Sequence, residues 1–178
     1  MIKELLQYDV PFSELESSVQ EWATEAIELR FGSGEDPQGP LYPLGPEAKV
    51  HEQTDFLYRV KKRVERVDLL YSNAIQAKAR ARRAQESAQF DATKAYEEAM
   101  RKNQASRTAD FITRDERVAD ASLDSFEQKR IAHHAGRLVS ITSEAYDVIR
   151  EMHWQLEALR KDVRAMIHAQ NFESSLER

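Results

Sequence analysis

The residues that interrupt secondary structure are concentrated in one short stretch of this chain. Four of its five glycines and four of its five prolines fall within residues 32–46, GSGEDPQGPLYPLGP. Because glycine and proline are the strongest local breakers of helices and strands, the rest of the 178-residue chain has few stops. This distribution predicts a linker, stiffened by its prolines, between two regions of long secondary structure.

The composition indicates which kind of secondary structure these regions form. Charged residues make up 32% of the chain and aromatic residues only 8%, which is typical of long helices and coiled coils. The absence of cysteine excludes disulfides and thiolate metal sites and is compatible with a reducing cytosol. The first residues, MIKELLQYDV, lack the apolar core of a signal peptide, and no apolar stretch approaches the roughly 18 residues of a membrane helix. We therefore expect a cytoplasmic protein without a membrane segment.

Residues 1–31 are expected to form a short helical arm ahead of the linker. Ser13 followed by Glu16 resembles a capping box, and Gly32 is a suitable stop. Apolar residues recur between them with helical spacing and form one stripe: Leu15, Val19, Trp22, Ala26 and Ile27.

A stretch without breakers from about Phe56 to Ala105 predicts the first long helix. Apolar residues recur along it every three or four positions, which places them on one face: Val60, Val64, Val67, Leu70, Ala74, Ala77, Ala81, Ala84, Ala88, Ala92, Ala95 and Ala99. This seam changes midway from branched side chains to alanine. Alanine would let a partner helix approach closely. Alternatively, alanine is present as the best helix former and the seam is only half buried.

A second long helix is expected after an interruption at residues 106–117. Thr113 and Glu116 have the spacing of a capping box, and the helix is predicted from Val118 to about Phe172. Its apolar residues alternate steps of three and four, as in a heptad seam: Thr142, Ala145, Ile149, Met152, Leu156, Leu159, Val163 and Met166.

Two long helices joined by a short turn predict an all-α fold, a long antiparallel helical hairpin that resembles a coiled coil. The hairpin would occupy residues 47–178, after the arm at 1–31 and the linker at 32–46. Because the alanine-lined half buries little area, we expect a homo-oligomer. The aliphatic part of the second seam would hold its subunits together: Ile149, Met152, Leu156, Leu159, Val163 and Met166.

The chain lacks the motifs that carry common enzyme chemistry. It has no Walker loop, dinucleotide fingerprint or nucleophile elbow. None of its histidines are four residues apart, the spacing that would set two imidazoles on one helical face beside a metal: His51, His133, His134, His153 and His168. We therefore expect no catalytic residues, no metal ligands, no cofactor and no enzymatic activity.

The net charge of −5 is unevenly distributed. Residues 1–58 carry 3 basic and 12 acidic side chains, a net of −9, and residues 59–117 carry 15 and 9, a net of +6. Residues 118–178 carry 8 and 10, a net of −2. A basic middle after an acidic arm indicates a polyanion-binding face, an electrostatic match between segments, or simply solvated helix faces.

The basic middle contains the best candidate binding residues. Within residues 75–90, IQAKARARRAQESAQF, four basic side chains lie on an outward arc opposite the alanine seam: Lys78, Arg80, Arg82 and Arg83. A second cluster comprises Arg101, Lys102 and Arg107. Such an array suffices for sequence-independent phosphate contacts. Aromatic side chains that could stack on unpaired bases are few in this part of the chain: Tyr71, Phe90 and Tyr96.

In this order of features the chain resembles the UvsY family of phage recombination mediators. The resemblance rests on ELLQYDVPFSEL near the start, a Leu57-Tyr58 step, Lys78-Ala79-Arg80 in an alanine-rich stretch, and AYDVIREMHWQLEALRKDVRAMIHAQNF near the end. The chain departs from the family pattern by its linker and by RRAQESAQF, which stands where aromatic residues are expected.

The resemblance implies a non-enzymatic mediator that helps load a RecA-type recombinase onto single-stranded DNA in competition with a single-stranded DNA-binding protein. It implies that Lys78 and Arg80 contact the DNA and that the subunits assemble through their helices, possibly as a ring. The protein would act in the host cytoplasm if a phage encodes it.

Two interpretations without nucleic acid stay open. The chain could be a scaffolding coiled-coil protein, such as a phage assembly component, whose basic face meets the acidic arm of a neighbouring copy. It could also be an adaptor or inhibitor that binds one protein partner through the stripe containing Trp22 and Ile27.

Overall fold

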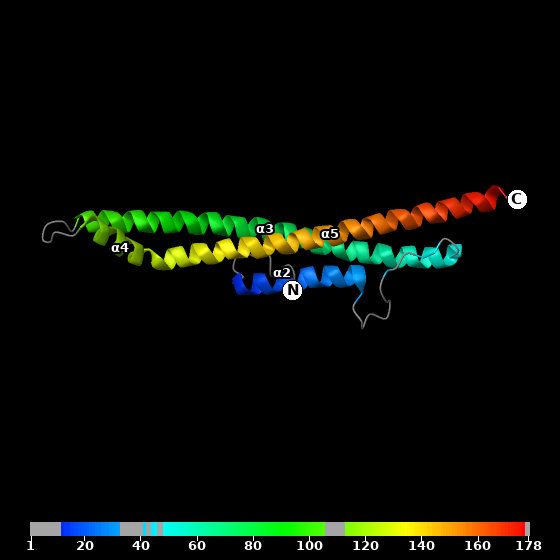
Figure 1. Cartoon of the computed structure of the whole chain (residues 1–178), viewed down its shortest axis with the longest axis horizontal. Coiled ribbons are helices and arrows are strands. Elements are labelled where there is room, and N and C mark those ends of the chain that lie inside the picture. Colours follow the sequence, from blue (N-terminus) through cyan, green and yellow to red (C-terminus); the bar gives the residue numbers. More distant parts are fainter. Residues whose placement is uncertain (1–11, 33–40, 42–43, 46–47, 106–112, 177–178) are drawn as a thin grey trace. The chain divides into compact units, whose positions relative to one another are not determined.

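The described part of the chain is all-α, as the sequence predicts. The computed structural model describes residues 12–32, 41, 44–45, 48–105 and 113–176. These residues contain no strand and form four helices: α2 (Phe12–Phe31), α3 (Val50–Ala105), α4 (Arg114–Asp124) and α5 (Phe126–Leu176) (Figure 1). The first eleven residues of the predicted arm, most of the predicted linker and Arg107 lie outside the described residues.

The helices belong to two compact units, to which both α3 and α5 contribute. Unit 1 comprises Met1–Gln76 and Ser143–Arg178, and unit 2 comprises Ala77–Thr142. In unit 1 the Ala48 carbonyl, just before α3, accepts a hydrogen bond from Gln170 Nε2 at 3.0 Å. Further along α3, the Tyr71 hydroxyl is 3.0 Å from that of Tyr146. The partner's number falls as the position along α3 rises, so the two helices are antiparallel and the predicted hairpin is confirmed.

Unit 1 has a core of large apolar side chains from three helices. Figure 1 shows α2 alongside the α3–α5 pair. The predicted stripes of all three helices supply the buried residues: Leu15, Val19, Trp22 and Ala26 of α2, Phe56, Val60, Val64, Val67 and Leu70 of α3, and Ile149, Leu156 and Val163 of α5. Burial of each large aliphatic side chain contributes about 1.5–3 kcal/mol, so this core is the main source of stability in unit 1.

Polar contacts also attach α2 to α3. The buried Arg63 donates from Nη1 to the Leu29 carbonyl at 3.0 Å, which satisfies a carbonyl at the end of α2. Arg66 makes a two-pronged ion pair with Glu25, with Nη2 3.0 Å from Oε2. The pair raises the pKa of Arg66 above its usual value, chiefly through the hydrogen bond to Glu25. The N-terminal segment expected to be an arm thus contributes α2 to the core of unit 1.

The ends of α2 test two local predictions. The helix begins at Phe12, so Ser13 lies in its first turn and the predicted capping position is wrong by at least one residue. At the other end Gly32 has a φ of 82°, and its N–H donates to the Glu28 carbonyl at 2.7 Å. A left-handed residue that closes the last turn is the usual helix stop, and glycine adopts it without strain. The predicted stop at Gly32 is therefore confirmed.

Unit 2 is built around alanine. Five alanines of the α3 seam are buried, namely Ala77, Ala81, Ala88, Ala92 and Ala99. They are accompanied by Ala121 of α4 and by Ala135 and Leu138 of α5. Ala84 and Ala95 are half-buried. The alternative of a half-buried seam therefore holds for only two of its alanines, and the rest pack as the close-approach interpretation predicts.

The second predicted helix is interrupted. Thr113 caps α4 as expected: its hydroxyl accepts the N–H of Glu116 at 3.2 Å, while the Glu116 carboxylate accepts the N–H of Thr113 at 2.7 Å. These bonds lower the pKa of Glu116. The single helix predicted from Val118 to Phe172 is wrong, however, because α4 ends at Asp124 and α5 begins at Phe126.

The break occurs at the buried residue Ser125, whose φ and ψ are −95° and 6°. Its hydroxyl donates to the Ala121 carbonyl at 2.8 Å. A serine hydroxyl that bonds back to the preceding turn competes with the helical ladder and bends helices. The break follows from this local competition, which the seam spacing does not reveal.

Candidate nucleic-acid interface

The four basic residues of the predicted run lie on the part of α3 that belongs to unit 2. Arg82 and Arg83 are exposed, whereas Lys78 and Arg80 are half-buried. Successive helical residues are rotated by about 100°, so Lys78 and Arg80 lie about 160° apart around the axis. They therefore stand on opposite flanks of the buried alanine seam. The Lys-X-Arg pair indicated by the family resemblance does not present both charges to one surface.

The second basic cluster lies toward the end of α3. Arg101 and Lys102 are exposed, and Arg107 lies outside the described residues. Arg101 follows Arg83 by five helical turns, so the two share a face and are about 27 Å apart along the axis. That face also carries acidic residues, and Lys94 on it is paired with Glu98 at 3.9 Å. The face containing Arg83 and Arg101 therefore has mixed charge.

The opposite flank of α3 has a different character. Starting at Lys78, steps of three and four residues trace a row of polar side chains along this flank: Lys78, Arg82, Gln85, Gln89, Thr93 and Tyr96. We call it the α3 polar row. It contains two cations, two amides, a hydroxyl and a phenol, and no carboxylate, in a chain with 31 acidic residues. An anion lying along this row would meet donors and positive charge without repulsion from a row member.

Small residues of α5 face the α3 polar row within unit 2. Gln85 Nε2 lies 3.4 Å from the position that a Cβ on Gly136 would take, so the amide lies over the glycine. Nearby, a cavity of about 570 Å³ is lined by Gln89, Ala92, Thr93, Tyr96, Lys129 and Ala132. We call it the unit 2 cavity. Because Gln89, Thr93 and Lys129 are exposed, the cavity is open to solvent.

One contact in the unit 2 cavity joins an aromatic ring to a cation. Lys129 Nζ of α5 lies 4.7 Å from the centroid of the half-buried Tyr96 ring of α3. Such a cation–π contact is worth about 0.5–1 kcal/mol at an exposed site. Tyr96 was one of three aromatic candidates in the sequence, but Lys129 was missed. No local signal marks Lys129, since only the pairing of the two hairpin helices brings it to Tyr96.

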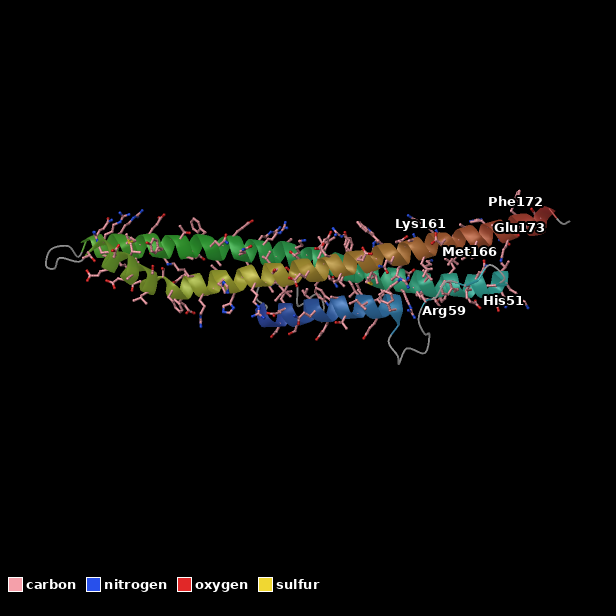
Figure 2. The ribbon with its side chains drawn as sticks, viewed as in Figure 1. His51, Arg59, Lys161, Met166, Phe172 and Glu173 are labelled. Carbon is pink, nitrogen blue, oxygen red and sulfur yellow. The ribbon has the colours of Figure 1, made fainter. Side chains whose placement is uncertain are left out.

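The residues predicted to hold subunits together lie in unit 1. Ile149, Met152, Leu156, Leu159 and Val163 are buried within the single chain, and Met166 is half-buried. Figure 2 shows Met166 on the side of α5 toward α3, whereas Lys161 and Phe172 extend from the other side. Packing within the hairpin therefore accounts for the burial of this seam. A contact between subunits through it stays a prediction.

Two further properties concern the described residues alone. Within the described ranges, no group of three or more histidine, aspartate or glutamate side chains is arranged to hold a metal ion. No helix in this part of the chain is long and apolar enough to cross a membrane.

Comparison of the chain with protein-family models, with curated proteins and with solved structures finds no match. The resemblance to the UvsY family therefore rests on the residues quoted for it. The α3 polar row and the unit 2 cavity rest on the geometry of unit 2.

Proposed function

We propose that this protein is a non-enzymatic recombination mediator that binds single-stranded DNA and helps load a RecA-type recombinase. The observation that carries the DNA-binding part is the α3 polar row, which continues into the unit 2 cavity without a carboxylate of its own. Lys78 and Arg82 would contact phosphates at one end of the row. Lys129 would extend the positive charge from α5.

A single strand suits this surface better than a duplex. The unit 2 cavity contains an aromatic ring beside a cation and an amide, the groups that accept an unpaired base and its phosphate. A duplex keeps its bases inside the stack and would leave the Tyr96 ring unused. The affinity would come mainly from phosphate contacts and would therefore fall steeply with salt.

The mediator part of the proposal is supported by the resemblance. An assembly of several copies would place several polar rows along one strand and gain avidity. It could then hold the strand away from a single-stranded DNA-binding protein while the recombinase nucleates. Because Leu156 and the rest of its seam are buried in the single chain, their use between subunits would require two chains to exchange helices.

The two flanks of α3 provide a matched test. One double variant, Lys78→Ala with Arg82→Ala, removes two charges from the polar row. The other, Arg80→Ala with Arg83→Ala, removes the same charge from the other flank of the same two turns. Fluorescence anisotropy with a labelled single-stranded oligonucleotide at several salt concentrations would measure affinity, and circular dichroism would verify helicity.

We expect the polar-row variant to lose more affinity and to reduce the slope of log K against log salt by about 2, since each lost phosphate contact removes about 1. The other double variant should change both quantities less. Equal losses would remove the assignment to the polar row. Absence of single-stranded DNA binding by the unmodified protein would refute the proposed function, and failure to stimulate recombinase assembly on coated DNA would refute its mediator part.

A scaffolding role is the second candidate, favoured by two exposed apolar residues of unit 2. Leu123 and Phe126 flank the bend at Ser125, with 72% and 62% of their surfaces exposed. Exposed apolar surface of this kind marks protein contacts. Under this interpretation native mass spectrometry would give an oligomer that Leu123→Ser with Phe126→Ser dissociates and that an oligonucleotide leaves unchanged. The adaptor interpretation has less support, because Trp22 is buried in unit 1.

A further inference from the structure

We propose that the unit 2 cavity receives one unpaired nucleobase, which stacks on Tyr96 while Lys129 moves from the ring to the adjoining phosphate. This inference rests on the proposed function and names the ligand group that the cavity takes. It assigns the base contact to Tyr96, whereas the family resemblance indicates only the basic pair Lys78 and Arg80.

The groups lining the cavity match the parts of a nucleotide. The Tyr96 ring offers a flat π surface, and its present neighbour is the ammonium of Lys129 at 4.7 Å. Gln89 carries an amide that can donate to or accept from a base edge. Thr93 Oγ1 donates to the Gln89 carbonyl at 2.9 Å, which leaves the oxygen lone pairs of Thr93 to accept a hydrogen bond. The volume of about 570 Å³ lies in the range of small-molecule sites.

The exchange at Tyr96 is favourable on physical grounds. A base stacked on an aromatic side chain is held more strongly than an ammonium at an exposed cation–π contact. Lys129 is exposed, and its flexible four-carbon stem lets the ammonium leave the ring without moving the backbone. The phosphate next to the stacked base then gives the ammonium a full negative charge as its partner. One lysine therefore covers the ring in the free protein and binds the backbone in the complex.

The position of the cavity favours a base that belongs to a strand. Lys78 and Arg82 of the α3 polar row lie on the same flank of α3 as Tyr96, and Arg82 precedes Tyr96 by about 21 Å along the helix axis. A strand with one base in the cavity can therefore run along the row and place further phosphates beside these cations. A free nucleotide would contact the cavity alone. We therefore expect strand binding to be much tighter than nucleotide binding.

Stacking on one ring also predicts little sequence preference. Every base has a π face, so binding by stacking tolerates all four bases. The lining includes one glutamine, Gln89, whose amide can rotate to suit either a donor or an acceptor on the base edge. Oligonucleotides that differ only in sequence should bind with similar affinity.

The test uses an oligonucleotide that carries one fluorescent adenine analogue, whose emission is quenched on stacking. We expect the unmodified protein to quench the analogue, and Tyr96→Phe to retain the quenching because the ring remains. Tyr96→Ala should abolish the quenching and weaken binding by about fivefold or more. Tyr58→Ala, an exposed tyrosine of unit 1, is the matched control and should change neither quantity.

A second variant separates the role of the cation. Lys129→Ala should retain the quenching while it reduces the slope of log K against log salt by about 1. An oligonucleotide with abasic sites should bind Tyr96→Ala and the unmodified protein equally, since no base is left to stack. Weak competition by free mononucleotides is expected, and competition as strong as that of the oligonucleotide would overturn the strand-bound base.

The outcomes distinguish this inference from the proposed function. If the unmodified protein binds single strands but Tyr96→Ala alters neither quenching nor affinity, the base site is wrong and DNA binding stands. If the unmodified protein binds no single strand at any salt, both are wrong. Quenching that disappears in Tyr96→Phe as well would also overturn stacking on the ring.

Discussion

Units 1 and 2 use the same two helices, α3 and α5, with different buried side chains. In unit 1 the seam consists of valine, leucine and isoleucine, and α2 adds Trp22 to it. In unit 2 the α3 seam is alanine throughout. A large aliphatic side chain contributes about 1.5–3 kcal/mol when it is fully buried, and alanine contributes far less. The comparison indicates that unit 1 supplies most of the stability of the chain.

The alanine seam has a compensating property. Small side chains at a helix contact let the two helices approach closely, so residues on the flanks of the contact come within reach of each other. In unit 2 these flanking residues include Tyr96 and Lys129, which meet across the hairpin. Unit 1 therefore has the larger core, and unit 2 has the surface that we assign to binding.

The largest expected effect comes from truncation in unit 1. Leu156→Ala should lower the free energy of unfolding by about 2–5 kcal/mol, because Leu156 is fully buried and its loss leaves a cavity. Urea unfolding followed by circular dichroism would measure it. Leu69→Ala is the matched control, since Leu69 is 45% exposed in the same unit and its loss should cost about 0.5 kcal/mol. Equal losses at the two positions would contradict the assignment of the core.

An intermediate effect is expected from enlargement of the seam in unit 2. Ala81→Leu should cost about 1–3 kcal/mol, because the larger side chain has to push apart helices that pack on a fully buried alanine. Ala79→Leu, two residues away and exposed, should be nearly neutral. Amide hydrogen exchange would show whether the loss is confined to unit 2. Increased stability of Ala81→Leu would show that the seam is loosely packed and would remove the contrast between the units.

The smallest effect concerns a polar contact in unit 1. The hydroxyls of Tyr71 and Tyr146 are 3.0 Å apart, and their rings are stacked with centroids 5.5 Å apart. The hydrogen bond to Tyr146, followed by burial, raises the pKa of Tyr71 above its usual 10.0. The neutral phenol is the stabilised form. Its contribution is complete below pH 10.0 and disappears as the pH rises through the raised pKa of Tyr71.

Tyr146→Phe should therefore bring the pKa of Tyr71 back toward its usual value and cost about 0.5–1 kcal/mol at neutral pH. Phenolate absorbance during an alkaline titration would follow the first quantity, and urea unfolding the second. Tyr58→Phe, on an exposed tyrosine of the same unit, is the control and should leave the titration of Tyr71 unchanged. A titration of Tyr71 that is the same in Tyr146→Phe would show that the bond does not hold in solution.

Local rules identified most of the helix ends. Gly32 ends α2 and Thr113 caps α4, as predicted, because each effect involves only the adjoining turn. The bend at Ser125 was missed, since a serine within a helical pattern is compatible with both a straight helix and a bend. Its burial and its bond to the Ala121 carbonyl favour the bend, and both depend on the folded surroundings.

The candidate site was only partly predictable. The outward arc of basic residues is a property of one helix, so periodicity located Lys78 and Arg82 correctly on α3. Periodicity could not select between the two flanks of α3, because that choice depends on what α5 presents to each of them. Lys129 was missed for the same reason, as 32 residues separate it from Tyr96 in the sequence.

The sequence by itself determined an all-α hairpin, since breakers confined to residues 32–46 and apolar steps of three and four leave no other regular structure. It also determined the change of seam from large residues to alanine, which is written directly in the residue types. Only the tertiary structure decided that α2 docks in unit 1 and that Lys129 covers the ring of Tyr96. Both are contacts between distant segments, and their geometry depends on the register of helices packed against each other.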